Sequence, residues 1–440
     1  MQKKMIALAV AAALTAPVMA FADTGASSVS LYGVLDLGVA QMTNAGDFAP
    51  TFVTGAVPVG VNTAGNGNAA RIGTVRGMMN GGESQSRWGI KGSEDLGDGS
   101  SAFFQLESAF SLGTGQLATS GLAGGANVPV GGINNGTMIA DTALNGQLFN
   151  RMALIGLSNA DLGTVTFGRQ YSLQLDIIGS VGGGYDPVNA QMFSPINFSG
   201  AYGGGGFTDN SRVDNAIKYA KKIGNFNVNA MYGMGGMAGA TSARTNFQAN
   251  AGYEADTFGV QAAVQYANDT SNIGAAAAPN TVTVQYADLT SYMLAGRWQV
   301  AEPVTLKAGY ERMQISAPSN FGADRNLGQI YSYNIASVSA FGSAQKNVNV
   351  YWLGANWQAT QATKVSVGFY DVKTPAFGTS PSDGTDKYYS AMVEYNLSKK
   401  TNLYAAAMHD VKSGALLVTT SGLGAISAFN TYGAGLRVKF

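Results

Sequence analysis

Two-residue alternation of apolar and polar side chains recurs along almost the whole chain and constrains its fold more than any other feature. In an early segment Val29 and Leu31 share one face, whereas Tyr32 and Asp36 share the other. The last ten residues, 431–440, repeat the pattern. Successive side chains of a β-strand point to opposite faces, so this period predicts strands with one wet face and one apolar face.

The alternating segments define a set of predicted strands. They cover residues 28–41, 85–95, 99–110, 148–158, 163–170, 212–222, 225–233, 245–255, 258–267, 281–300, 303–315, 347–358, 363–373, 387–397, 401–411 and 431–440. This set contains about sixteen strands, an even number within the range known for outer-membrane barrels.

The connections between these strands alternate strictly between short and long. Short ones such as 95–98, 159–162, 223–224 and 398–400 are rich in Gly, Asp, Asn, Ser or Lys, as tight turns require. The long ones cover residues 42–84, 111–147, 171–211, 234–244, 268–280, 316–346, 374–386 and 412–430. All tight turns then lie at one rim and all long loops at the other, which a soluble β-sandwich has no reason to arrange. We therefore predict an all-β fold: a closed antiparallel transmembrane β-barrel with short periplasmic turns and long external loops.

The first residues predict export from the cytoplasm. Lys3 and Lys4 precede an apolar run over 5–16, and a small-x-small cleavage signal follows at 20–22. This order is typical of a secretory signal peptide, so we expect residues 1–22 to be cleaved and 23–440 to form a single barrel domain in the outer membrane. After residue 22 no apolar run of about 18 residues occurs, so the sequence predicts no transmembrane helix.

The composition excludes several kinds of chemistry. The chain has no cysteine, one histidine and equal numbers of basic and acidic residues, 26 of each. We therefore expect no thiolate metal site, no cofactor and no nucleic-acid partner, and we predict that the chain is not an enzyme. The low charged fraction, 12 %, suits a chain that contacts a second apolar environment such as lipid, because about 25 % is usual in soluble proteins.

Several longer motifs resemble one known family. They are Ser86–Gly99 followed by Ala102–Glu107, the Asn150-Arg151 pair, Leu162–Gln170, Arg212–Tyr219 and the final Phe440. Together they resemble the Gram-negative general porin family, in particular its beta-proteobacterial branch. The resemblance implies a homotrimer of 16-stranded barrels in outer-membrane lipid, with the third long loop folded into each lumen. It also implies passive diffusion of small hydrophilic solutes and ions, often with anion preference, and an assembly signal at Phe440 for the barrel-assembly machinery.

The third loop departs from the family pattern. It contains glycine runs at 182–184 and 203–206 and lacks the Pro-Glu-Phe-Gly run of some relatives. The resemblance therefore leaves the geometry of the constriction open.

Alternation also predicts which charged side chains face the lumen. Arg87 and Lys91 alternate with Trp88 and Ile90, and Arg212 and Lys218 oppose apolar neighbours in the same way. A charge on the lipid face near mid-bilayer costs about 2–4 kcal/mol, so inward placement is favoured. By the family resemblance Arg151 matches a lumen arginine. Arg169 shares the parity of Phe167 and needs a bulge or the loop entry to reach water.

These charges define a predicted pore constriction. Its residues are Arg87, Lys91, Arg151, Arg212 and Lys218 on the barrel wall and Asp176, Asp186 and Asp209 on the third loop. A hydrated pore selects ions by charges placed where low-dielectric walls focus the field. We expect a transverse field with a weak anion preference. Alternatively, some of these charges pair with one another and only keep the lumen wet.

Other functions stay open at this stage. The chain could be a substrate-specific outer-membrane channel, or an adhesin whose long loops bind another surface. An outer-membrane enzyme such as a lipase would need a serine beside the single histidine, His409, on the lipid-facing surface.

Overall fold

The computed structural model describes most of the chain between Ser28 and Phe440. The described residues are 28–45, 73–117, 128–130, 133–135, 138–139, 148–179, 184–195, 212–236, 241–242, 245–268, 272–275, 278–283, 288–316, 346–375, 383–414, 417–420 and 424–440. Within these ranges no helix has the length and apolar character needed to cross a membrane. The predicted signal peptide, residues 1–22, lies outside them.

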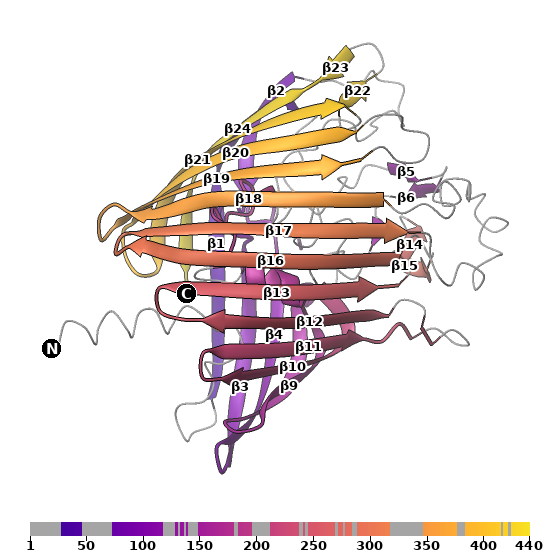
Figure 1. Ribbon diagram of the computed structural model, residues 1–440, viewed down its shortest axis with the longest axis vertical. Coiled ribbons are helices and arrows are strands. Elements are labelled where there is room, and N and C mark those ends of the chain that lie inside the picture. Colours follow the sequence, from indigo (N-terminus) through magenta and orange to yellow (C-terminus); the bar gives the residue numbers. More distant parts are fainter. Residues whose placement is uncertain are drawn as a thin grey trace.

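A closed antiparallel barrel forms the body of the molecule (Figure 1): its sheet has 17 strands, two of which share one position, so that the barrel has sixteen strand positions. In order around the barrel the strands are β1 (Ser28–Ala45), β3 (Arg87–Gly97), β4 (Ser100–Ala109), β8 (Met152–Asn159), β9 (Gly163–Tyr171), β10 (Arg212–Ile223), β11 (Phe226–Gly233), β12 (Asn246–Glu254), β13 (Phe258–Ala267), β16 (Asp288–Ala301), β17 (Val304–Ser316), β18 (Lys346–Gln358), β19 (Thr363–Thr374), β20 (Gly384–Asn396), β21 (Thr401–Gly414) and β24 (Ala428–Lys439). The barrel closes because β1 pairs with β3 on one side and with β24 on the other. The predicted fold class is confirmed.

The second strand of the barrel is interrupted. Residues 73–80 form β2 (Gly73–Asn80), which pairs with the later part of β1, while β3 pairs with the earlier part. β2 and β3 therefore share one strand position. The prediction missed β2 and assigned its residues to the first long loop, because the segment 81–86 breaks the alternation between the two halves.

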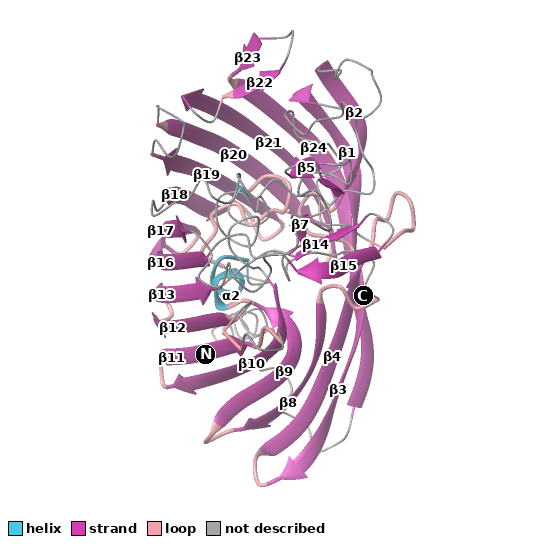
Figure 2. Ribbon diagram, turned by 90° about the vertical axis from the view of Figure 1, so that its right-hand side faces the viewer, coloured by secondary structure: helices cyan, strands magenta, loops and turns pink. Residues whose placement is uncertain are grey.

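The tenth strand is shorter than predicted. It was expected over 281–300, but β16 begins at Asp288. Residues 278–283 form a separate strand, β15 (Ala278–Thr283), which pairs with β14 (Asn272–Ala275). The remaining short strands are β5 (Val128–Val130), β6 (Ile133–Asn135), β22 (Val418–Thr420) and β23 (Gly424–Ile426), labelled in Figure 1, and β7 (Met138–Ile139), labelled in Figure 2.

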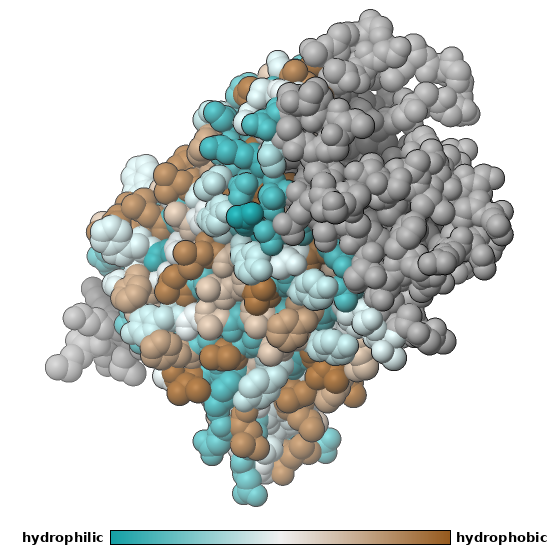
Figure 3. All heavy atoms as spheres, turned by 45° about the vertical axis from the view of Figure 1, so that its right-hand side comes forward, coloured by the Kyte–Doolittle hydropathy of each residue, from teal (hydrophilic) through white to brown (hydrophobic). Residues whose placement is uncertain are grey.

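The outer face of the barrel is apolar over much of its surface (Figure 3). Outward side chains such as Leu353 and Val367 are about half exposed, whereas their inward neighbours Trp352 and Ser366 are buried. Exposed aromatic side chains lie near both ends of the strands from β9 onward. They are Phe167, Tyr219, Phe226, Tyr232, Phe247, Phe258, Tyr266, Tyr292, Trp298, Tyr351, Trp357, Tyr389, Tyr395, Tyr432 and Phe440. Two aromatic belts flanking an apolar band are the usual surface of a barrel in a bilayer.

The third long loop, which follows β9, runs inside the barrel. Its short helix α2 (Leu173–Gly179) lies within the lumen (Figure 2). Ile177, Ile178, Met192 and Phe193 of this loop are buried against inward apolar side chains of the barrel wall. Those wall residues include Leu289, Met293, Met313, Val348, Val350, Trp352, Val372 and Met392. The hydrophobic core of this protein is therefore inside the barrel, between the loop and the wall from β13 to β21.

Candidate functional site

Three arginines surround one glutamate on the lumen wall opposite this apolar core. Arg87 is the first residue of β3 and pairs with Val34 near the middle of β1, so it lies well inside the barrel. Glu107, on β4, faces the same side because it lies opposite Gly89, two residues from Arg87 along β3. Arg151 immediately precedes β8, and Arg212 is the first residue of β10. Four neighbouring elements thus bring their charged side chains together.

Glu107 is the centre of this cluster and is 3 % exposed. Its carboxylate accepts a hydrogen bond from Arg151 Nε at 2.5 Å and one from the Tyr171 hydroxyl at 3.0 Å. It also accepts one from the Tyr32 hydroxyl at 3.0 Å and forms an ion pair with Arg87 Nε at 3.5 Å. Burying a carboxylate is costly unless it is paired and hydrogen-bonded, and these four contacts meet that requirement.

Tyrosine and glutamine side chains hold the arginines in place. The guanidinium carbons of Arg151 and Arg212 lie 5.4 and 5.5 Å from the centre of the Tyr171 ring. Arg151 also donates hydrogen bonds to the Tyr171 hydroxyl and to the Gln85 side-chain oxygen. Arg87 donates to the Gln85 main-chain oxygen at 3.0 Å. Stacking on an aromatic face stabilises a desolvated guanidinium, which explains how like charges stay close together here.

Two predicted lysines lie on the same wall. Lys91 Nζ is 5.6 Å from the centre of the Tyr32 ring, and Lys91 pairs with Ser30 on the inward face of β1. Lys218, on β10, forms an ion pair with Asp176 and donates to the Tyr171 main-chain oxygen at 3.1 Å. Lys218 therefore ties the third loop to the wall from which the loop starts.

Arg169 reaches buried partners through a bulge. Gly168 has a φ of +120°, and the pairing of β9 with β10 shifts register between Val213 and Ala216. Beyond the bulge Arg169 is 8 % exposed, forms an ion pair with Asp214 and donates to the Asn150 main-chain oxygen at 2.7 and 3.0 Å. A bulge re-aims a side chain in this way because it adds a residue to one strand.

The two loop aspartates that the structure describes, Asp176 and Asp186, pair with the barrel wall rather than face the arginines across the lumen. Asp176 is paired with Lys218 on the near wall. Asp186 is fully buried against the far wall, where its carboxylate accepts from the Tyr370 hydroxyl at 2.6 Å, the Val188 amide at 3.2 Å and the Ser194 hydroxyl. Asp186 is thus an anchor of the loop, because a carboxylate with these neutral donors is withdrawn from the water of the lumen. Asp209 lies outside the described residues.

Sequence reasoning missed the neutral and acidic partners of the arginines. Glu107 could have been found, because it shares parity with Gln105 on a strand adjacent to Arg87. Tyr32 could have been found as well, because it has the same parity as Asp36 and therefore lies on the polar face of the first strand. Gln85 and Tyr171 gave no such signal, since each lies where a strand begins or ends and its orientation depends on the neighbouring loop.

The arrangement suits ion permeation rather than bond chemistry. The cluster of Arg87, Arg151, Arg212 and Glu107 brings three basic side chains together with one acidic side chain. Among the described residues, no three His, Cys, Asp or Glu side chains are grouped to hold a metal ion.

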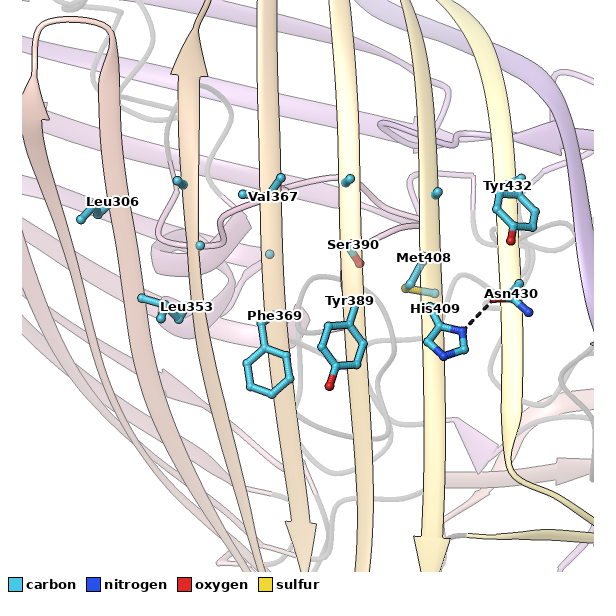
Figure 4. A pocket seen from close by; sticks show the side chains of 15 residues that line it. Leu306, Leu353, Val367, Phe369, Tyr389, Ser390, Met408, His409, Asn430 and Tyr432 are labelled. Carbon is cyan, nitrogen blue, oxygen red and sulfur yellow. Dashed lines mark hydrogen bonds between the residues drawn. The ribbon is translucent and has the colours of Figure 1, made fainter.

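His409 lies on the other side of the barrel wall, facing outward. It borders a groove of about 660 Å³ on the outer surface, between Leu306 and Tyr432 (Figure 4). Its Nδ1 is 2.7 Å from the Asn430 side-chain oxygen. Ser390 also lines the groove, yet it pairs with Met408 rather than with His409 and is 6 % exposed, on the inward parity of β20. Ser390 therefore does not supply the serine that a lipase would need beside His409.

Comparisons with known proteins agree with this geometry. Residues 7–415 match a family described as Gram-negative porin. The chain is 28 % identical to an outer membrane porin protein of Bordetella pertussis, over 94 % of this chain and 98 % of that protein. Among solved structures it resembles an anion-selective porin from Comamonas acidovorans, with a TM-score of 0.61 and 19 % identity over 94 % of this chain and 100 % of that one. It also resembles the trimer form of OmpT from Vibrio cholerae, with a TM-score of 0.55 and 14 % identity over 94 % and 100 % of the two chains.

Proposed function

The chain belongs to the Gram-negative porin family and is a general outer-membrane porin channel, and on this premise we propose that its pore is weakly anion-preferring. The family is non-enzymatic. The solutes that we propose to permeate are small hydrophilic molecules and ions, moving by passive diffusion.

The observation that carries the proposal is the imbalance of charge around Glu107. Arg87 and Arg151 pair with this one carboxylate and Arg212 lies against the Tyr171 ring beside it, so these four charged side chains together carry a net positive charge. The two described loop aspartates do not offset it, because one pairs with Lys218 and the other is buried against the far wall. A low-dielectric wall focuses such a charge into the water of the lumen and raises the local concentration of anions. A structural neighbour, the Comamonas porin, is itself described as anion-selective.

Charge reversal at Arg87 tests this proposal. Arg87 has a side chain that is 11 % exposed and is less enclosed by hydrogen bonds than Arg151. We expect the reversal potential of Arg87→Glu in a salt gradient to move toward cations in planar bilayers. Arg297→Glu is the control matched in charge, because Arg297 pairs with Glu254 elsewhere on the wall, and it should move the reversal potential less. A parent channel whose own reversal potential lies on the cation side would refute the anion preference, and an unchanged value in Arg87→Glu would show that Arg87 is not at the filter.

We also propose a homotrimer that contacts through the outward faces of β1, β3, β4 and β8. None of the exposed aromatic side chains of the described residues lies on these strands, which instead present Val29, Leu31, Val39, Ile155 and Leu157. The outward aromatic side chains of β3 and β4, Trp88 and Phe104, are only partly exposed, and a face without exposed aromatic side chains suits contact with protein better than contact with the lipid interface. The OmpT neighbour is described as a trimer form. Ile155→Trp should abolish trimers on unheated gels, whereas Leu353→Trp on β18 should not. Trimers in both variants would count against this face.

Export and assembly complete the proposal. We propose that residues 1–22 are a cleaved signal peptide and that Phe440 contributes to recognition by the barrel-assembly machinery in the outer membrane. Phe440 follows the closing strand β24, and its amide and carbonyl exchange hydrogen bonds with Gly33 at 3.1 and 3.2 Å. Intact mass of the purified protein tests cleavage before Asp23. Phe440→Ala should lower the amount of folded protein in outer membranes, and an undiminished amount would contradict the assembly role.

A further inference from the structure

A six-residue turn projects into the lumen where the second strand of the barrel is interrupted. β2 ends opposite Leu37 and β3 begins opposite Val34, so the two residues 35–36 of β1 face the six residues 81–86. The four extra residues are accommodated because the chain turns into the lumen here. We call residues 81–86 the inward turn. Gly81 opens it with a φ of +79°, a conformation that favours glycine.

One buried carboxylate organises this turn. Asp36 of β1 is fully buried, and its carboxylate accepts from the Glu83 amide at 3.0 Å and from the Ser84 amide at 2.7 Å. The other carboxylate oxygen accepts from the Tyr404 hydroxyl at 2.6 Å. The main chain of Asp36 also binds both ends of the turn, through the Gly81 amide at 3.1 Å and the Ser86 hydroxyl at 2.9 and 3.0 Å.

The inward turn links this carboxylate to the arginine cluster. Gln85, the fifth residue of the turn, accepts a hydrogen bond from Arg151 with its side-chain oxygen and one from Arg87 with its main-chain oxygen. Two of the three arginines are therefore held by a residue whose position depends on Asp36.

The same turn also binds the third loop. The Gln191 amide donates to the Glu83 carbonyl at 3.0 Å, and the Met192 amide donates to the Gly82 carbonyl at 3.1 Å. In return the Gln85 amide donates to the Gln191 side-chain oxygen at 2.8 Å. The inward turn thus fixes the arginines and the third loop relative to each other.

We propose that Asp36 is a positioning residue for ion selectivity, acting through the inward turn and Gln85 on Arg87 and Arg151. The inference rests on the proposed anion preference of the arginine cluster. Without Asp36 the turn loses the acceptor of two of its amides, Gln85 is no longer fixed, and the two guanidinium groups separate. The positive field at the cluster then weakens, although Asp36 touches neither arginine.

The sign of the effect distinguishes positioning from simple charge removal. Asp36→Leu removes the acceptor of both turn amides, which an asparagine carbonyl would keep, and it also removes a negative charge, which by electrostatics alone would increase anion preference. Positioning predicts the opposite, a fall in the anion-to-cation permeability ratio of about twofold or more, as expected for residues coupled in one hydrogen-bond network. Asp386→Leu is the matched control, because Asp386 is equally buried on the inward face of β20 but pairs with Lys412, far from the turn.

The experiment measures reversal potentials of the full-length porin in planar bilayers under a salt gradient, after a heat-modifiable gel shift has shown folded barrels. We expect Asp36→Leu and Gln85→Ala to shift selectivity toward cations, with no further shift in the double variant, while Asp386→Leu does not. Gln85→Ala changes no charge and carries the test alone should Asp36→Leu not fold.

The outcomes separate the inference from the proposed function. If Arg87→Glu changes selectivity but Asp36→Leu follows Asp386→Leu toward anions, or Gln85→Ala has no effect, the positioning role is wrong and the anion preference stands. If Arg87→Glu has no effect, the arginine cluster does not set selectivity and the inference fails with it, whatever the parent channel prefers.

Discussion

Removing one hydroxyl, in Tyr370→Phe, should loosen the third loop without altering the barrel. Tyr370 is fully buried on β19 and donates to the Asp186 carboxylate at 2.6 Å, where the loop crosses the far wall. Leaving a buried acceptor without its donor costs about 1–3 kcal/mol. A cost of this size raises the population of the detached loop about 5- to 150-fold.

Other hydrogen bonds hold the same part of the third loop to the barrel wall, and Tyr370→Phe leaves them in place. Lys307 Nζ donates to the Gly184 and Asp186 carbonyls at 2.5 and 3.0 Å, and the Trp352 indole donates to the Tyr185 carbonyl at 3.0 Å. The defect should therefore appear as motion of the loop rather than as loss of folded protein.

Single-channel recording measures this prediction. We expect more frequent transitions between conductance levels in Tyr370→Phe than in the parent channel, at unchanged heat-modifiable mobility. Tyr310→Phe is the control, because the Tyr310 hydroxyl bonds Asn349 at 2.8 Å away from the loop. Equal transition frequencies in all three proteins would show that the Asp186 anchor does not hold the loop.

Three further substitutions probe packing and the lipid face. Gly354→Val should destabilise the folded barrel by about 1–3 kcal/mol, as overpacking does. A Cβ at this position would lie 2.1 Å from the Val367 carbonyl oxygen and 2.4 Å from Pro187 of the third loop. The temperature at which the barrel unfolds, read from the shift in gel mobility on heating, should therefore be lower. Leu353→Arg, on the outward face near the middle of β18, should cost about 2–4 kcal/mol, measured by denaturant unfolding in lipid vesicles. Gly38→Ala should impair closure of the barrel, because a Cβ at Gly38 would lie 2.2 Å from the Ala434 carbonyl oxygen of β24; a normal yield of folded protein would contradict this.

The strands were largely predictable because one physical rule governs each of them. A side chain faces either lipid or lumen, so apolar and polar residues alternate, and the predicted ranges match most observed strands within a few residues. The rule failed where a segment faces neither lipid nor the water of the lumen. β2 escaped notice because the inward turn beside it consists of small and polar residues buried within the protein.

The candidate site was predictable only in part, for a related reason. Parity placed Arg87 and Lys91 on the inward face, and it indicated that Arg169 needs a bulge. It could not show how a loop folds back, so Asp186 was expected at the acidic wall although it is buried under Tyr370. The partners of a loop carboxylate come from strands distant in sequence, and alternation contains no information about them.

The apolar half of the inner wall has a consequence for engineering. Side chains such as Met313, Val350 and Val372 face inward and are dry only because the third loop covers them. Shortening that loop to obtain a wider pore would bring water against a hydrocarbon-like surface. Hydrophobic pore linings favour expulsion of water, so the trimmed channel should flicker or close rather than conduct more, unless polar residues are introduced on the exposed strands at the same time.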